Sequence, residues 1–105
     1  MPYERQGPAG WAVHPGEILK EEFLRPLEIS NYRLAKSIDV NAQAVGDIVL
    51  RKRGISAEMA VRLAKFFGTS AEFWMNLQAA YELAHAKKAL KKEIAKIQPR
   101  STSAA

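Results

Sequence analysis

The stretch LAKSIDVNAQAVGDIV, residues 34–49, decides the fold of this chain. Apolar side chains recur in it at the spacing of one helical face, on both sides of a short break at Asp39 and Val40. The pattern predicts two short helices packed against each other and against a helical core, a helix-turn-helix. Ser30 is expected to cap the first helix and Asn41 the second. The predicted inward-facing residues are Leu34, Ala35, Ile38, Val40, Val45 and Ile48.

The outer face of the second helix is predicted to be nearly bare, because Ala42, Ala44 and Gly46 provide its small side chains. A glycine inside a helix costs about 1 kcal/mol relative to alanine. In a helix-turn-helix the second helix enters the DNA major groove, and a thinly covered face enters a groove about 12 Å wide more deeply. We therefore interpret this face as a DNA-fitting surface from which Gln43 can reach an adenine edge. Asp39 holds the turn position that usually carries glycine, where aspartate tolerates the expected positive φ.

The segments before and after this stretch also have helical spacing. Residues 1–13 hold two prolines and two glycines without periodicity and are expected to form a flexible arm. A first helix is expected to begin at Pro15 and to stop at Pro26. Another follows the predicted cap Ser56 and ends before Gly68.

The last helix, capped by Ser70 or Thr69, is expected to continue to about Ile97. The predicted fold is therefore all-α: a five-helix, lambda-repressor-like DNA-binding domain with an extended C-terminal helix. Its domains are an arm over 1–13, the helix-turn-helix domain over 14–83, and an extension with a frayed basic tail over 84–105.

Composition excludes several classes of function. The chain has 105 residues and no cysteine, which predicts a single domain in a reducing compartment. No apolar run approaches the roughly 20 residues that span a bilayer, and MPYERQGPAGW is no secretory signal, so we expect a cytoplasmic protein without membrane contact. His14 and His85 are the only histidines, and no ligand cluster or nucleophile motif accompanies them. We expect no catalytic site, metal or cofactor, and interpret His14 as the residue that starts the first helix.

The net charge of +5 is concentrated in two blocks. Residues 31–65 carry seven basic and three acidic residues, and residues 85–100 carry six basic and one acidic residue. The first block indicates an acidic partner such as nucleic acid. The second block has a simpler interpretation as a solvated helix face.

Three segments together resemble the HigA family of antitoxins, a branch of the lambda-repressor-like helix-turn-helix proteins. They are HPGEILKEEFLRPLEIS at 14–30, the motif at 31–50, and GISAEMAVRLAKFFGTSAEFWMNLQAAYEL at 54–83. The resemblance implies a transcriptional autorepressor that binds a palindromic operator in its own promoter as a homodimer. It also implies a second partner, a HigB-type toxin that cleaves messenger RNA and that the protein neutralises.

The resemblance further implies which residues meet DNA. Asn31 matches a position that holds a phosphate, and the basic turn from Arg51 to Arg53 follows the second motif helix; a solvated turn is the alternative for these cations. Asp47 either accepts from a cytosine amino group or repels wrong registers. The expected DNA-contacting set is Asn31, Asn41, Ala42, Gln43, Asp47, Arg51, Lys52 and Arg53.

Two apolar stripes follow the motif. The first contains Phe73, Trp74, Leu77 and Tyr81 and is interpreted either as core or as a dimer interface, where aromatic residues are enriched. The second lies on a different face of the same helix and contains Leu83, Ala86, Leu90, Ile94 and Ile97. It is predicted to be buried by a partner, with the second subunit preferred to the toxin. A frayed basic tail is the alternative. The expected partner-contacting set is Phe73, Trp74, Leu77, Tyr81, Leu83, Leu90 and Ile94.

Two other functions remain open at this point. One is a protein-interaction module that has lost operator binding, which the sparse second helix and Asp47 would allow. The other is a stand-alone or phage-type repressor without a toxin. A small basic reading frame beside the gene would favour the antitoxin.

Overall fold

A computed structural model describes residues 12–100, and every regular element in that range is helical. Because α1, η2 and α2 form one continuous run, these residues hold five principal helices followed by the short α7, which confirms the predicted all-α fold. None of these helices is long and apolar enough to cross a membrane. The elements in chain order are α1 (Pro15–Ile18), η2 (Leu19–Leu24), α2 (Arg25–Leu27), α3 (Asn31–Ser37), α4 (Ala42–Val49), α5 (Ala57–Phe67), α6 (Ala71–Ala89) and α7 (Lys91–Ala95).

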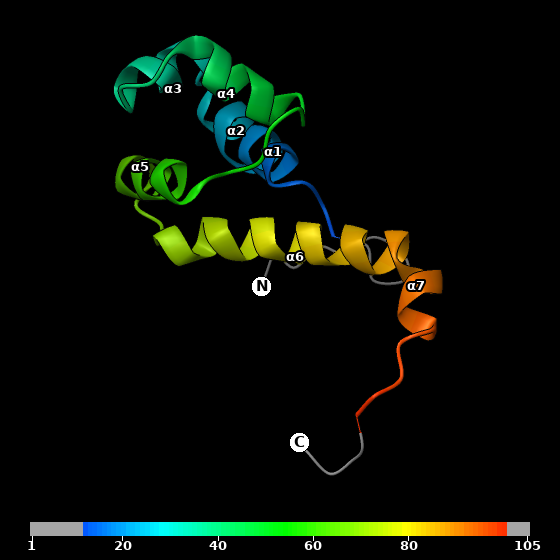
Figure 1. The fold of residues 1–105 in the computed structure, drawn as a ribbon. Coiled ribbons are helices and arrows are strands. Elements are labelled where there is room, and N and C mark those ends of the chain that lie inside the picture. The colour runs from blue at the N-terminus through cyan, green and yellow to red at the C-terminus, as the bar shows by residue number, and fades with distance from the viewer. Residues whose placement is uncertain (1–11, 101–105) are drawn as a thin grey trace.

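The helices form a compact group from which α6 projects. Figure 1 shows α3 and α4 at one end of the molecule, with α1 and α2 beside α4, and α6 running along the opposite side. The largest fully buried residues come from five of these elements and from Pro15 at the start of α1. They are Trp74, Leu19, Leu34, Ile48, Leu63, Val45 and Pro15. All the predicted inward-facing residues of α3 and α4 are buried, and Val40 between them is partly buried against the same core.

The first helix does not stop at Pro26, contrary to the prediction. In η2, a π-helical segment, the N–H of Arg25 donates to the carbonyl of Lys20, five residues earlier. Proline has no N–H and its ring clashes with the carbonyl four residues before it in an α-helix. The wider π-helical turn gives the ring room, so the helix continues to Leu27 and ends at Glu28, whose φ is 56°.

The predicted helix starts are confirmed. Side-chain oxygens of Ser30, Asn41, Ser56 and Ser70 each accept the N–H of the residue three positions later, at 2.8–3.1 Å. Thr69, the other candidate for the start of α6, accepts instead from the indole N–H of Trp74 at 2.8 Å.

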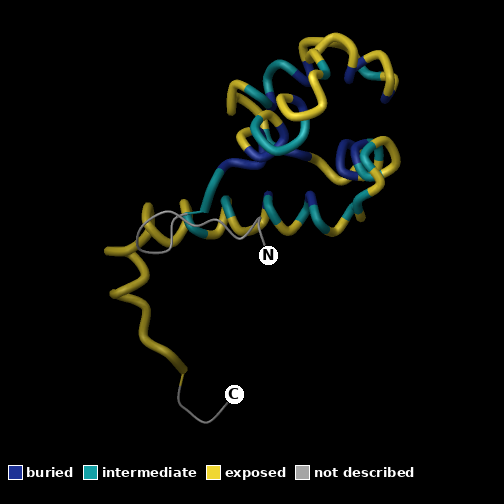
Figure 2. Tube along the Cα trace, turned by 180° about the vertical axis from the view of Figure 1, so that it is seen from behind, coloured by how far each residue is buried: buried dark blue, intermediate teal, exposed yellow. Residues whose placement is uncertain are grey.

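The C-terminal extension is helical but bent. α6 ends at Ala89, and the backbone of Leu90 (φ −102°, ψ 15°) turns the chain into α7. The expectation of one helix running to about Ile97 is therefore wrong. Figure 2 shows why a bend is tolerated: the distal end of α6 and all of α7 are exposed, so no core contact holds them in line. The predicted domain boundary between residues 83 and 84 lies inside α6.

Candidate nucleic-acid interface

The N-terminal end of α4 is presented to solvent. Asn41, Ala42 and Gln43 are exposed at the start of the helix, while Val45 and Ile48 anchor its other side in the core. Asn41 caps the helix, because its Oδ1 accepts the N–H of Ala44 at 2.8 Å. The side-chain oxygen of Asn41 thus bonds to the helix, and its amide NH₂ group remains able to donate to other partners.

The bare face of α4 is narrower than predicted. Ala44 is only 8% exposed and packs in the core, so it does not belong to the outer surface. Because a helix turns 100° per residue, Ala44 lies on the same side as Val45 and Ile48. The outer face consists of Ala42, Gln43, Gly46 and Asp47. A Cβ placed on Gly46 would meet no atom within 4 Å, so this face is open at its middle.

The turn between α3 and α4 has the predicted backbone. Asp39 has a φ of 63°, which confirms the expected left-handed conformation. Arg62 of α5 holds this turn: its guanidinium donates to the carbonyl oxygens of Ile38 at 2.7 Å and Asp39 at 3.3 Å, and pairs with Glu58 at 3.0 Å. Sequence reasoning placed Arg62 only in the basic block, because its partners in the turn are more than twenty residues away.

The basic turn directly follows α4. Arg51, Lys52 and Arg53 are all exposed, and Arg51 reverses the chain with a φ of 65°. The N–H of Lys52 donates to the carbonyl oxygen of Asp47 at 2.8 Å, which ties the turn to the last part of the helix. Arg51 also lies 3.5 Å from a carboxylate oxygen of Glu17, so its charge is shared with the first helix.

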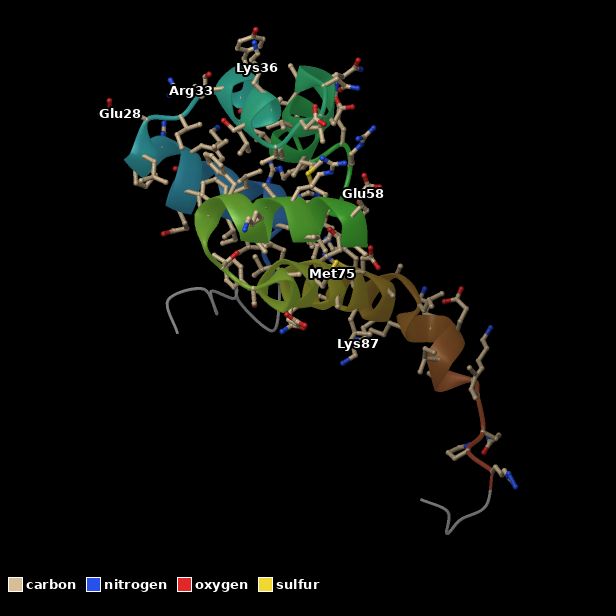
Figure 3. All side chains as sticks on the ribbon, turned by 90° about the vertical axis from the view of Figure 1, so that its left-hand side faces the viewer. Glu28, Arg33, Lys36, Glu58, Met75 and Lys87 are labelled. Atoms are coloured by element: carbon tan, nitrogen blue, oxygen red, sulfur yellow. The ribbon has the colours of Figure 1, made fainter. Side chains whose placement is uncertain are left out.

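Helix α3 presents the predicted Asn31 together with two cations that the predicted set did not contain. Asn31 is exposed at its first turn, as the predicted phosphate contact requires. Figure 3 shows Arg33 and Lys36 projecting from α3 on the side of the molecule away from α6. The ammonium group of Lys36 lies 5.8 Å from the ring centroid of the exposed Tyr32. In the sequence, the excess of basic residues over 31–65 was the feature that could have pointed to Arg33 and Lys36.

The position of α4 depends on α1. A Cβ on Gly16 would overlap the carbonyl oxygen of Ile48, so the two backbones touch where α1 meets the end of α4. His14 starts α1 as predicted, since its Nδ1 accepts the N–H of Gly16 at 2.8 Å. Burial, together with the nearby positive charge of Arg51, lowers the pKa of His14 below its ordinary value of 6.5. A lowered pKa favours the neutral imidazole that can accept this hydrogen bond.

The partner-contacting set divides into two groups. Trp74 is fully buried and packs between Phe23 and Phe73, with ring centroids 5.0 and 4.9 Å away, so its assignment to an interface is wrong and it belongs to the core. Phe73 and Leu77 are half-buried against the same core.

Tyr81 lies where the core ends. Its ring lies 4.7 Å from that of His14 and 4.3 Å from that of His85. Beyond it, Leu83, Leu90 and Ile94 are between 45% and 56% exposed.

Together these elements form one surface built from α3, the outer face of α4 and the basic turn. It combines an open helix face with the exposed cations of the basic turn and with Arg33 and Lys36 of the neighbouring α3. Its chemistry suits a groove lined by base edges and bordered by phosphates.

Comparison with known proteins identifies the family. The helix-turn-helix family matches residues 19–74, which include η2, α2, α3, α4 and α5. "Virulence-associated protein I" from Dichelobacter nodosus is 45% identical over 93 residues, which cover 89% of this chain and 85% of that relative. An uncharacterized HTH-type transcriptional regulator from Haemophilus influenzae is 48% identical over 68 residues, which cover 65% of this chain and 64% of that relative.

The fold also matches solved structures in three dimensions. The structure of Pseudomonas aeruginosa antitoxin HigA with the higBA promoter has a TM-score of 0.81 and 53% sequence identity, covering 83% of this chain and 96% of that chain. Helix-turn-helix regulators bind DNA and are not enzymes, in agreement with the prediction of no catalytic role. The chain therefore belongs to the HigA family of helix-turn-helix antitoxins.

Proposed function

We propose that this chain is the antitoxin of a type II toxin–antitoxin pair that acts in the cytoplasm. It binds a palindromic operator in its own promoter as a dimer, represses its own operon, and neutralises a HigB-type toxin that cleaves messenger RNA. The observation that carries the proposal is the open face of α4, followed by the basic turn, in a chain 53% identical to a HigA protein whose structure contains its promoter.

In this proposal α4 lies in the major groove with its N-terminal end against the bases. Ala42, Gln43 and Asp47 meet base edges, and Gln43 is suited to bidentate contact with adenine. The phosphate contacts come from the two ends of the motif, which are the start of α3 and the basic turn. They are made by Asn31, Arg51, Lys52 and Arg53, and Asn41 at the cap of α4 contacts DNA between them.

The proposed dimer uses the C-terminal extension. One helix reads too few base pairs to be selective, and two copies related by a two-fold axis place their recognition helices one DNA turn apart, about 34–36 Å. Leu83, Leu90 and Ile94 supply exposed apolar surface for a second subunit. The half-buried Phe73, Leu77 and Tyr81 lie on another face of α6 and are a further candidate contact. The toxin is the other candidate occupant of the extension.

A second candidate function is a stand-alone repressor without a toxin. The similarity to an uncharacterized HTH-type transcriptional regulator from Haemophilus influenzae favours it. DNA binding by α4 is the same in both functions, and only the toxin distinguishes them.

Two measurements test the proposal. Fluorescence anisotropy should show the chain binding a duplex from its own promoter about a thousandfold or more tighter than a scrambled duplex. Expression of the small reading frame beside the gene should arrest growth, and co-expression of the chain should restore it. Operator binding without any toxin to neutralise supports the stand-alone repressor. Neutralisation without operator binding identifies an interaction module and contradicts the DNA-binding part of the proposal.

A further inference from the structure

We propose, building on the proposed function, that Gln78 is a positioning residue for DNA binding. From α6 it holds the C-terminal end of the basic turn and so sets where Arg51, Lys52 and Arg53 lie relative to α4. No DNA contact by Gln78 itself is involved, because the residue acts through the backbone of Ile55.

Gln78 is buried and hydrogen-bonded at both ends of its amide. Among residues 12–100, the buried polar or charged residues are Gln78 and His14. The Oε1 of Gln78 accepts the N–H of Ile55 at 2.7 Å, and its Nε2 donates to the Glu82 carboxylate at 2.7 Å. With a donor on one side and an acceptor on the other, the amide is held in one orientation.

Gly54 gives an independent sign of the same contact. A Cβ on Gly54 would lie 2.5 Å from Nε2, 2.6 Å from Oε1 and 2.7 Å from Cδ of Gln78. The chain therefore passes directly against the amide, and a side chain at residue 54 would displace the Gln78 amide from this position. Ile55 follows with 2% of its surface exposed, so the turn is drawn into the protein at this point.

The basic turn is consequently held at two ends. At its start, the N–H groups of Arg51 and Lys52 donate to the carbonyl oxygens of Ile48 and Asp47 in α4, at 3.0 and 2.8 Å. At its end, Gln78 holds Ile55. The backbones of Arg51 and Lys52 form the first attachment and Arg53 lies between the two, so the reach of all three side chains toward phosphates depends on both attachments.

Without the second attachment, the cations would spread over more positions. DNA binding would then have to order the turn, and the entropic cost of that ordering would make the free energy of binding less favourable. The number of phosphates neutralised at once would fall, and with it the steepness of the salt dependence.

The test compares Gln78→Met with Glu82→Gln in the full chain. Methionine has a similar length but removes both hydrogen bonds, whereas Glu82→Gln keeps an acceptor for Nε2 and leaves the bond to Ile55 intact. Without DNA, trypsin should cleave after residues 51–53 several-fold faster in Gln78→Met than in the wild type or Glu82→Gln. With promoter DNA, the slope of log K against log salt should become shallower by about 0.9 for each phosphate that the turn no longer neutralises.

A triple variant identifies the route of the effect. In the background Arg51→Ala, Lys52→Ala, Arg53→Ala, adding Gln78→Met should leave DNA affinity unchanged, because the cations it positions are gone. If the substitution weakens binding equally in both backgrounds, or leaves cleavage of the turn unchanged, the proposal is overturned. Should Gln78→Met fail to fold, Gly54→Ala disturbs the same contact from the turn and is expected to give the same two results.

The proposed function fails separately. If the wild-type chain does not bind its promoter, operator recognition is contradicted, but the proteolysis result still decides the contact. If trypsin cleaves the turn of Gln78→Met faster than that of the wild type, Gln78 holds the turn in place. If the two rates are equal, Gln78 does not hold the turn.

Discussion

Gly16 in α1 touches the carbonyl oxygen of Ile48 in α4, at a distance that leaves no room for a side chain at residue 16. Both residues are buried, and they are separated by more than thirty positions in the chain. The close approach, rather than an unusual backbone angle, is the reason for glycine here. The first helix thereby sets where the proposed DNA-reading helix sits on the core.

Replacing Gly16 with alanine should lower the free energy of unfolding by about 1–3 kcal/mol, the usual cost of overpacking a core. The added methyl meets backbone, which cannot rotate aside as a side chain can. Urea denaturation followed by circular dichroism measures the change. A denaturation midpoint equal to that of the wild type would show that α1 and α4 are not in fixed contact.

Replacing Gly46 with alanine serves as the matched control and should have the opposite effect on stability. A Cβ there meets nothing within 4 Å, so the helix gains about 1 kcal/mol from the better helix former. Operator affinity should fall, because the methyl group projects from the face proposed to enter the groove. Denaturation and anisotropy on the same variant check both signs, and unchanged operator affinity would contradict the close approach of DNA at residue 46.

Gln43→Ala and Lys52→Ala should weaken DNA binding in different ways. The glutamine variant is expected to lose about 1–3 kcal/mol on the operator and to relax preference at one base pair in each half-site. The lysine variant should weaken all sequences similarly and flatten the salt dependence. Anisotropy titrations against operator and scrambled duplexes at several salt concentrations separate them. Identical, sequence-independent losses would mean that base and phosphate contacts are wrongly assigned.

The stability of the fold should depend on pH through His14. Burial and the charge of Arg51 lower its pKa in the folded chain below the value of 6.5 that applies when unfolded. The unfolded chain therefore binds the proton more readily, and the free energy of unfolding should fall as the pH drops below about 6.5. Above that pH both states are neutral at this residue and its contribution is fully retained.

His14→Asn is the control for this pH dependence, because asparagine can accept the N–H of Gly16 but does not titrate. Urea midpoints for both proteins between pH 5 and pH 8 give the comparison. The wild type should lose stability relative to the variant at the acid end. Parallel curves across the range would rule out His14 as the source.

Removing residues 90–105 leaves α6 complete and removes three residues of the exposed stripe, Leu90, Ile94 and Ile97. We expect the chain to shift toward monomer in light scattering and to bind the operator about a hundredfold more weakly, since two linked half-sites no longer act together. A variant with Lys91, Lys92 and Lys96 replaced by alanine controls for the removed net charge of +3. Loss of toxin neutralisation with an intact dimer would place the toxin on the stripe instead, and full retention of all three properties would leave the stripe without a partner.

Local features of this chain were predictable from sequence. Four capping side chains, the left-handed turn at Asp39 and the inward positions of α3 and α4 all occur as expected. Each depends on residues within about four positions of one another, where hydrogen-bond geometry and helical spacing leave few choices. Among the wrong predictions, only the helix end at Pro26 has a local cause. The π-helical turn before Pro26 accommodates the proline ring, and the spacing of apolar residues does not reveal such a turn.

The sequence by itself determined the helix starts and their caps, the helix-turn-helix, and the bare face with the basic turn after it that together predict DNA binding. Tertiary structure decided which of those residues remain available: it buried Ala44 and Trp74, and it bent the chain at Leu90. It also created the three long-range contacts that hold the motif, from Gly16, Arg62 and Gln78. Their partners lie more than twenty residues away, and such contacts form only when helices pack at particular distances and angles, which no local pattern of residues encodes.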